Sequence, residues 1–213
     1  MTTTRWWWLR HAPVRGGTGL IYGRTDLEIE PPSPDRIERI AKALPDNAVW
    51  IVSDLRRTHQ TAALLAPYHP GAHAPIEEAD FAEMDFGRWE GVARDQISAE
   101  EEKAYWEDFV RQGAPGGESF GDVVARVIRA VTRYTNEHGG RDIVAVAHSG
   151  SIKAALTLGA GVTPESTQAF ATDPLSLTRM EHTGDDDGVF WMITLVNGSP
   201  GGDEPLPAAP TRS

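Results

Sequence analysis

Short apolar runs, rich in β-branched and aromatic residues, alternate along the chain with segments of helical periodicity. The apolar runs predict strands at residues 5–9, 49–52, 143–147 and 189–196. The helical patterns cover residues 33–43, 55–66, 99–112, 119–138 and 151–158. Strands that alternate with helices form a mainly parallel sheet that is covered on both faces. The expected fold class is therefore α/β, a three-layer α/β/α sandwich around one central sheet.

Two of these segments carry further signals. Residues 119–138 open on Ser119, with Asp122 three positions later in capping-box spacing, and two glycines follow the helix. Residues 81–112 contain several aromatic and acidic side chains. We expect this stretch to form an insertion that covers one end of the sheet.

The last part of the chain predicts a change in the sheet. Residues 175–181 and 189–196 have strand character, and the Gly- and Asp-rich segment between them, residues 182–188, predicts a hairpin loop. The sheet is then mixed at one edge. Farther on, Gly and Pro dominate and little can be buried. We assign residues 1–197 to a single domain and residues 198–213 to a disordered tail.

Composition excludes several classes of function. The 213 residues carry 20 Lys and Arg against 31 Asp and Glu, a net charge of −11, which disfavours a nucleic-acid partner because such affinity comes from cationic contacts to phosphate. The absence of cysteine excludes disulfides and thiolate chemistry. No apolar run reaches the roughly 18 residues of a membrane span, and the apolar run near the start is too short for a secretory signal. We expect a cytoplasmic protein without a membrane partner.

Two predicted strands end in histidine. Arg10 and His11 close the first strand, and His148 follows residues 143–147. Open parallel sheets bind ligands beyond the carboxyl ends of their strands, although a histidine at such an end is more often structural than catalytic. The two histidines can share a site only if their strands are neighbours. Their surroundings lack the spacing of zinc ligands, so no metal is expected.

The helix that follows the second strand offers an anion site. Ser53 or Asp54 can cap this helix, and Arg57 falls in its first turn, near backbone N–H groups that attract anions. A guanidinium at that position clamps phosphate strongly. We expect one of Arg56 and Arg57 to be solvated instead.

Three carboxylates follow at residues 83–91, among aromatic residues and glycines. An acid held near apolar rings has its ionised form disfavoured and can donate a proton near neutral pH. For Asp85 and Glu90 we favour solvated or structural hydrogen-bonding roles.

Together these segments resemble the histidine phosphatase superfamily, also called the phosphoglycerate mutase-like family, over roughly residues 5–196. The family's Leu-Arg-His-Gly appears with Ala12 in place of glycine, and its Ser-x-Leu-x-Arg-Ala-x-Gln-Thr-Ala appears with Thr58 in place of alanine. Its acid segment, its Gly-Glu-Ser helix start and its second histidine motif match residues 83–91, 117–119 and 147–150. These motifs stand in family order, which makes the resemblance specific.

The resemblance implies a mechanism. His11 would attack phosphorus and form a phosphohistidine intermediate, while Arg10, Arg57 and His148 would hold the phosphoryl oxygens. Glu83 would protonate the leaving oxygen and then activate the water that hydrolyses the intermediate. The scheme implies a metal-independent phosphomonoesterase that needs no cofactor.

Further substrate contacts are implied near the same motifs. Ser149 belongs to the second histidine motif and is expected to bind phosphate. The loop of residues 15–23 lacks the asparagine that often touches phosphate in the family, and four residues are open as substitutes: Arg15, Thr18, Tyr22 and Arg24. Residues 22–27 resemble the Gly-x-Thr-Asp segment of α-ribazole phosphatases, which favours a small phosphorylated metabolite as the substrate.

Two alternatives remain beside a phosphatase. Cofactor-dependent phosphoglycerate mutases carry longer insertions around a bisphosphate, whereas this chain is short between Ser53 and Glu83. A catalytically silent phosphate-binding module is disfavoured because all five expected catalytic residues are retained. The physiological substrate and the oligomeric state, a homodimer included, stay open. With a net charge of −11, attraction of an anionic substrate must come from a few local cationic groups.

Overall fold

The computed structural model describes residues 2–185 and 188–200, and its centre is one six-stranded sheet. The strand order is β3-β2-β4-β1-β5-β6. The first four strands of that order run parallel, whereas β5 and β6 are antiparallel to their neighbours. Their bounds are β1 Thr2–Arg10, β2 Val49–Val52, β3 Ile76–Glu77, β4 Asp142–Ala147, β5 Leu177–Asp185 and β6 Gly188–Gly198. The predicted mixed sheet is confirmed.

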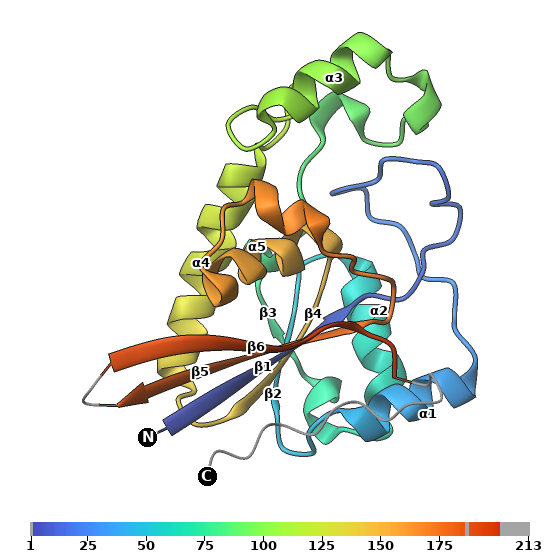
Figure 1. The fold of residues 1–213 in the computed structure, drawn as a ribbon. Helices are drawn as coiled ribbons and strands as arrows, with labels where there is room; N and C mark the ends of the chain where they lie inside the picture. The colour runs from blue at the N-terminus through green and yellow to red at the C-terminus, as the bar shows by residue number, and fades with distance from the viewer. Residues whose placement is uncertain (1, 186–187, 201–213) are drawn as a thin grey trace.

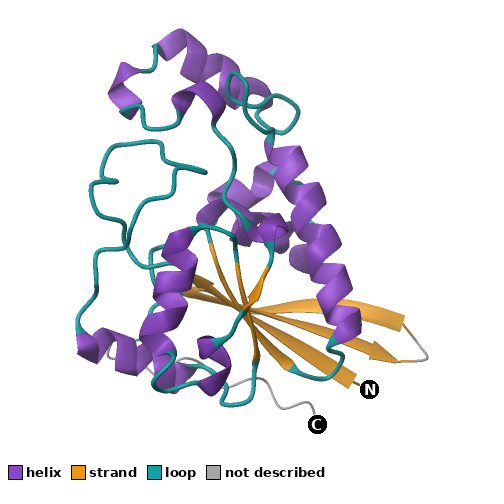
Figure 2. Cartoon of the chain, turned by 180° about the vertical axis from the view of Figure 1, so that it is seen from behind, coloured by secondary structure: helices purple, strands orange, loops and turns teal. Residues whose placement is uncertain are grey.

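Helices cover both faces of the sheet and complete the three predicted layers (Figures 1 and 2). Helices α1 (Pro34–Ala43) and α2 (Arg56–Leu65) pack on one face, and α4 (Phe120–Glu137) and α5 (Ser149–Ala160) pack on the other. Side chains of β1 alternate between the two cores because successive strand residues point to opposite faces. Trp6 and Trp8 stack in the α4 core, with ring centroids 5.3 Å apart, and Leu9 joins the α1 core.

The helix starts test the capping predictions. At α4, Ser119 and Asp122 form the predicted capping box, and each side chain accepts a hydrogen bond from the backbone N–H of the other residue. At α2, the prediction is wrong: Leu55 is the N-cap, and the Arg56 N–H donates to Asp26 Oδ1 at 2.7 Å. The cap therefore comes from a distant loop, which no local spacing reveals.

Two helix boundaries differ from the predicted ones. Helix α5 begins at Ser149, not at residue 151, which makes His148 its N-cap. Helix α3 (Ala99–Asp108) ends before residue 112 because the chain turns there, with the Asp108 carbonyl accepting hydrogen bonds from two following N–H groups. The shift at α5 matters for function, since it places a histidine at the positive end of a helix dipole.

The hairpin is tighter than predicted, because β5 continues to Asp185 and β6 begins at Gly188. Residues 186–187 of the predicted connection lie outside the described residues. The predicted tail is also shortened, since β6 runs through Gly198, and residues 201–213 lie outside the described residues.

The sequence did not predict β3 or the five short 3₁₀ helices of the described chain, which are η1 Pro70–His73, η2 Ala79–Phe81, η3 Gly87–Trp89, η4 Arg94–Gln96 and η5 Glu165–Ala169. With α3, elements η3 and η4 form a lobe that stands over the sheet (Figure 1), as expected of residues 81–112. Within the described chain, no helix has the length and apolar character needed to cross a membrane.

Candidate active site

The two histidines meet because their strands are neighbours. Strands β1 and β4 pair in parallel, with Arg10 opposite Ala147, so His11 and His148 follow at adjacent strand ends. Their ring centroids are 5.1 Å apart, and both side chains are buried. The chain leaves β1 toward α1 on one face and leaves β4 into α5 on the other, which opens a crevice between the two strand ends. We call the group His11, His148, Arg10 and Arg57 the histidine pocket.

The hydrogen bond of His11 fixes its tautomer. Its Nδ1 lies 2.6 Å from the Ala12 carbonyl oxygen, and a carbonyl can only accept, so Nδ1 carries the proton. The lone pair then resides on Nε2, which makes no hydrogen bond within the described chain. Burial, followed by the charges of Arg57 and Arg10, holds the pKa of His11 well below the ordinary 6.5. His11 is therefore a neutral imidazole with one free nitrogen, which is the form a nucleophile needs.

His148 has the opposite tautomer. Arg57 Nε donates to His148 Nδ1 at 3.2 Å, so the His148 proton is on Nε2, 2.7 Å from Ser53 Oγ. Burial and the Arg57 charge hold the pKa of His148 well below 6.5. The Ser53 hydroxyl thus orients His148, and it also accepts from the Leu55 N–H at 3.2 Å from a position before the N-cap of α2.

Arg57 is completely buried at the start of α2. Its two terminal nitrogens donate to the Thr25 and Gly23 carbonyls, the first at 2.9 Å, and its guanidinium lies 5.4 Å from the centroid of the Tyr22 ring. These contacts and the bond to His148 use three of its five N–H groups. No carboxylate pairs with Arg57 in the described chain, so its charge is available to a ligand. As expected for one member of the pair, Arg56 is half exposed.

Arg10 carries a second unpaired charge. Its Nη1 donates to the Thr172 carbonyl, while its Nε is buried without a hydrogen-bond partner among the described residues. A buried donor without a partner is costly, and an anionic ligand oxygen would remove that cost. Two guanidinium groups beside two neutral histidines make the histidine pocket a local anion site within an acidic molecule.

The Glu83 side chain lies against the first turn of α5, beside the second histidine motif. Its Oε1 accepts from the Met84 and Gly150 N–H groups, both at 3.0 Å. The contact is close because Gly150 lacks a side chain: a Cβ there would lie 2.2 Å from Glu83 Oε1. The helix N-terminus therefore holds the carboxylate next to the histidine pocket.

Three of the other predicted substrate residues have mixed surroundings. Ser149 Oγ lies 2.7 Å from Thr172 Oγ1 near Glu83. Tyr22 lies against Arg57, as described above. Arg24 instead forms a 2.9 Å ion pair with Asp54. Of the three, Arg24 already has a protein counter-charge and is the least available to a substrate.

The other two acids of the Glu83 segment have structural contacts. Burial raises the pKa of Glu90, but hydrogen bonds from the Thr25 hydroxyl and from the N–H groups of Phe86, Arg24 and Thr25 outweigh burial and lower it. Asp85 Oδ1 accepts from the Gly87 N–H at 2.7 Å. Both side chains shape the loop that carries Glu83.

Arg126, which no sequence motif singled out, anchors that loop. Its guanidinium donates to the carbonyls of Asp80, Ala82 and Glu83 and makes a two-pronged ion pair with Glu118. A signal was present, because Arg126 lies within the apolar stripe of the helix at residues 119–138. A charged residue on a buried face needs partners, and here the partners position Glu83.

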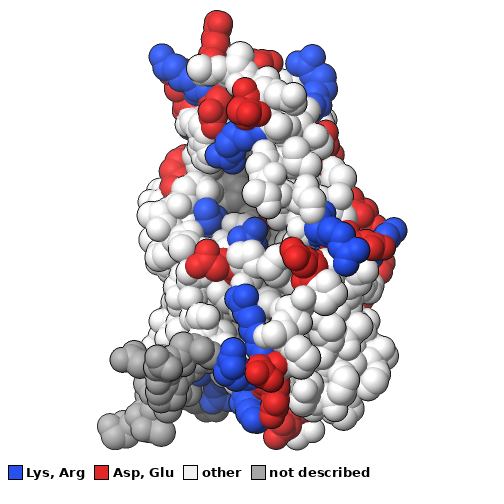
Figure 3. Space-filling view, turned by 90° about the vertical axis from the view of Figure 1, so that its right-hand side faces the viewer, with Lys and Arg blue, Asp and Glu red and all other residues white. Residues whose placement is uncertain are grey.

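Figure 3 shows a hollow in the surface beneath the lobe, with cationic and acidic side chains below it. Among residues 2–185 and 188–200, no cluster of three or more His, Cys, Asp or Glu side chains could hold a metal ion.

The fold and the paired strand-end histidines define a histidine phosphatase architecture. Residues 6–194 match the family model described as histidine phosphatase superfamily (branch 1). The chain therefore belongs to this superfamily.

Several mycobacterial proteins are similar in sequence. An acid phosphatase of Mycobacterium tuberculosis is 29% identical over 157 residues, which cover 70% of this chain and 72% of that protein. The bifunctional protein Rv2228c of the same organism is 32% identical over 113 residues, and this match covers 52% of the present chain. It spans only 30% of the length of Rv2228c.

Solved structures show the same fold. The mycobacterial glucosyl-3-phosphoglycerate phosphatase Rv2419c aligns with a TM-score of 0.80 at 23% identity, over 92% of this chain and all of that one. A putative α-ribazole-5'-P phosphatase from Escherichia coli aligns with a TM-score of 0.78 at 22% identity, over 94% and 99% of the two chains. These alignments show that the chain shares the fold of those two proteins over nearly its whole length.

Proposed function

We propose that this protein is a phosphomonoesterase that hydrolyses a small phosphorylated metabolite through a phosphohistidine on His11. The observation that supports it most is the fixed tautomer of His11, whose free Nε2 lies in a pocket with two guanidinium groups that no carboxylate pairs within the described chain. A phosphoryl group there would meet both a nucleophile and the charges that stabilise its transition state.

In the first step, the lone pair of His11 Nε2 forms a bond to phosphorus and the ester P–O bond breaks. Glu83, protonated, gives its proton to the leaving oxygen. Arg10, Arg57 and His148 hold the phosphoryl oxygens, for which His148 exchanges its Ser53 contact. In the second step, water attacks phosphorus, the N–P bond breaks, and the Glu83 carboxylate takes a proton from that water. Ser149 and Tyr22 are proposed as flanking contacts, and Arg24 as a contact only if Asp54 releases it.

The decisive experiment traps the intermediate. The protein is mixed with ³²P-labelled 4-nitrophenyl phosphate, quenched in alkali within milliseconds, and tested for protein-bound phosphate that is labile to acid. We expect label on wild-type protein and none on His11→Ala, whose turnover falls by about 10⁴-fold or more. Circular dichroism checks that the variant is folded. A wild-type protein that neither hydrolyses the ester nor takes up label contradicts the proposal.

Two further readouts address the finer points. Activity that survives exhaustive chelation supports metal-independent hydrolysis, and activity restored only by added metal contradicts it. Phosphate transferred between phosphoglycerates, without release of inorganic phosphate, indicates a mutase instead.

A further inference from the structure

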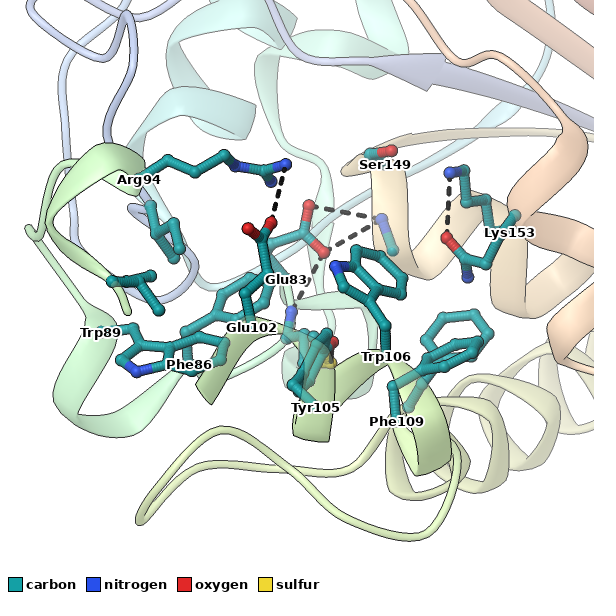
Figure 4. A pocket seen from close by; sticks show the side chains of 16 residues that line it. Glu83, Phe86, Trp89, Arg94, Glu102, Tyr105, Trp106, Phe109, Ser149 and Lys153 are labelled. Atoms are coloured by element: carbon teal, nitrogen blue, oxygen red, sulfur yellow. Dashed lines mark hydrogen bonds and ion pairs between the residues drawn. The ribbon is translucent and has the colours of Figure 1, made fainter. Parts of the chain in front are cut away.

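Next to Glu83 lies a cavity of about 220 Å³ that the proposed mechanism does not use. It is bounded by the lobe on one side and by the first turns of α5 on the other (Figure 4). Glu83, Ser149 and Gly150 line it, so it begins where the leaving group of a bound ester would start. We call it the aromatic cavity, after the rings that line it: Phe86, Trp89, Tyr105, Trp106, Phe109 and Phe120.

These rings form a connected wall. Trp89 and Tyr105 meet edge to face at 5.3 Å between centroids, as do Tyr105 and Trp106 at 5.1 Å, and Trp106 lies tilted against Phe109 at 5.4 Å. Burial and the nearby Glu83 carboxylate raise the pKa of Tyr105, so its hydroxyl stays neutral. Trp106, by contrast, is 46% exposed although it lines the cavity. An indole that is left partly open at a cavity mouth can stack on a planar guest.

The wall also disfavours guests rich in hydroxyl groups. A buried hydroxyl that finds no hydrogen-bond partner is destabilising, and the rings supply few acceptors. The charged residues of the lobe side are engaged with each other, since Arg94 pairs with Glu102 at 3.9 Å. The guest that fits this wall is flat and apolar on its faces.

One cation on the opposite wall forms no ion pair with a described residue. Lys153 Nζ donates to the neutral amide of Gln168 at 3.1 Å and forms no ion pair with any described residue. Burial lowers the pKa of Lys153, while the charge of Glu83 acts against that shift. An ammonium group has three donors, and Lys153 thus has capacity for an anionic acceptor inside the cavity.

The position of Lys153 determines how a bound molecule would be oriented in the cavity. Lys153 is one helical turn beyond Ser149 on α5, about 6 Å farther along the axis, and His148 lies at the opposite, N-terminal end of that helix. A guest that is bonded to phosphorus in the histidine pocket therefore passes Glu83 before it reaches Lys153. The two cationic regions would bind opposite ends of one molecule.

We propose that the aromatic cavity binds the alcohol portion of the substrate, and that this portion is an aromatic or heteroaromatic ring with an anionic substituent held by Lys153. This inference rests on the proposed phosphatase function and names its substrate class. The ring stacks on Trp106, and the ester oxygen lies at Glu83.

The test compares matched substrates. The rates kcat/KM are measured for 3- and 4-carboxyphenyl phosphate and for the corresponding carbamoylphenyl phosphates, which have the same shape without the charge. For whichever of the 3- and 4-isomers is hydrolysed faster, we divide kcat/KM of the carboxylate ester by kcat/KM of the amide ester. We expect this carboxylate-to-amide ratio to fall about tenfold or more in Lys153→Met, as for a lost hydrogen bond to a charged group. Lys153→Arg should restore part of the ratio. Lys103→Met, an exposed lysine on α3, is the control and should leave the ratio unchanged.

The ring is tested separately. Trp106→Ala should lower kcat/KM about two- to tenfold for all four aryl esters, with the loss mainly in KM, and should not affect glycerol 3-phosphate. If wild type and Lys153→Met show the same carboxylate-to-amide ratio for both isomers, the inference is overturned while the phosphatase stands.

A wild-type protein that hydrolyses none of these esters overturns the phosphatase proposal instead. The ligand class is then decided by calorimetric binding of the same four compounds. A carboxylate preference that disappears in Lys153→Met supports the cavity assignment, and equal binding of acid and amide rejects it.

Discussion

The histidine pocket and the aromatic cavity adjoin at Glu83, yet they are built in opposite ways. The pocket is made of polar groups at strand and helix ends, and its donors and acceptors fix one another within the core. The cavity is made of rings from the lobe, and helix α3 buries only Tyr105 among its ten residues. The two regions thus have different sources: the ends of strands and helices position the reactive groups, whereas the lobe supplies most of the rings of the cavity.

The largest expected effect comes from Arg57, which lies at the centre of the pocket. Arg57→Met removes a buried charge and leaves the Gly23 and Thr25 carbonyls without their donor. We expect kcat/KM for 4-nitrophenyl phosphate to fall by about 10³-fold or more, and Arg57→Lys to recover little because it lacks the planar fork. Arg56→Met, one residue earlier and exposed, should stay within about threefold of wild type. Similar losses at both positions would contradict the assignment of phosphate binding to the buried Arg57 and not to the exposed Arg56.

Glu83 tests the boundary between the two regions. Glu83→Gln keeps an acceptor for the Gly150 N–H but cannot donate a carboxyl proton. Esters with poor leaving groups, such as glycerol 3-phosphate, should lose about 10²- to 10⁴-fold in kcat, while 4-nitrophenyl phosphate should lose less than about tenfold because its leaving group needs little protonation. Equal losses on both esters would argue against the acid role.

Gly150 offers a way to move Glu83 without replacing it. The added methyl of Gly150→Ala would meet the end of a flexible side chain, so the carboxylate shifts and the helix persists. We expect a loss of about 10- to 100-fold on poor leaving groups, as for other small misplacements of catalytic groups, and no further loss when it is combined with Glu83→Gln. Gly139→Ala, where the new Cβ has only a contact at 3.9 Å, is the matched control. Additive losses in the double variant would contradict the assignment.

The sequence predicted the pocket better than the cavity for a physical reason. His11 and His148 each follow a short apolar run, and parallel strands bring their carboxyl ends to one edge, so local patterns located both. The cap of α2 by Asp26 and the bonds of Arg126 to the Glu83 loop depend on tertiary contacts between distant segments. No local spacing encodes those contacts.

Lys153 shows the same limit in the cavity. In the sequence it is an ordinary helical lysine, and its significance arises only because it is buried beside a neutral partner and forms no ion pair with a described residue. The aromatic and acidic residues of the stretch 81–112 predicted an insertion over the sheet, but not which rings would face Glu83. Which lobe residues face Glu83 thus depends on tertiary packing, whereas the positions of the strand-end histidines follow from local sequence patterns.

The pocket should also make stability depend on pH. Both buried histidines have a folded-state pKa well below 6.5, because of burial and then the Arg57 charge. Below pH 6.5 the unfolded chain binds more protons than the folded one, so stability is fully present above that pH and is lost as the pH falls. The slope approaches about 1.4 kcal/mol per pH unit for each histidine. Urea unfolding at pH 7.5, 6.5 and 5.5 measures it, and His148→Asn should have a shallower slope than wild type. Parallel curves for the two proteins would show that the burial argument fails.

The smallest expected effect concerns the aromatic cavity, where an exposed ring and a buried ring should contribute differently to stability. Trp106→Ala should change the free energy of unfolding by no more than about 1 kcal/mol, because its ring is nearly half exposed on the lobe. Phe120→Ala, in a ring that lines the same cavity but is 3% exposed at the start of α4, should cost about 3–5 kcal/mol. Urea denaturation of both variants measures this contrast. If Trp106→Ala were as destabilising as Phe120→Ala, Trp106 would belong to the core together with Tyr105 and Phe109, and it could not be replaced without affecting the fold that holds the histidines.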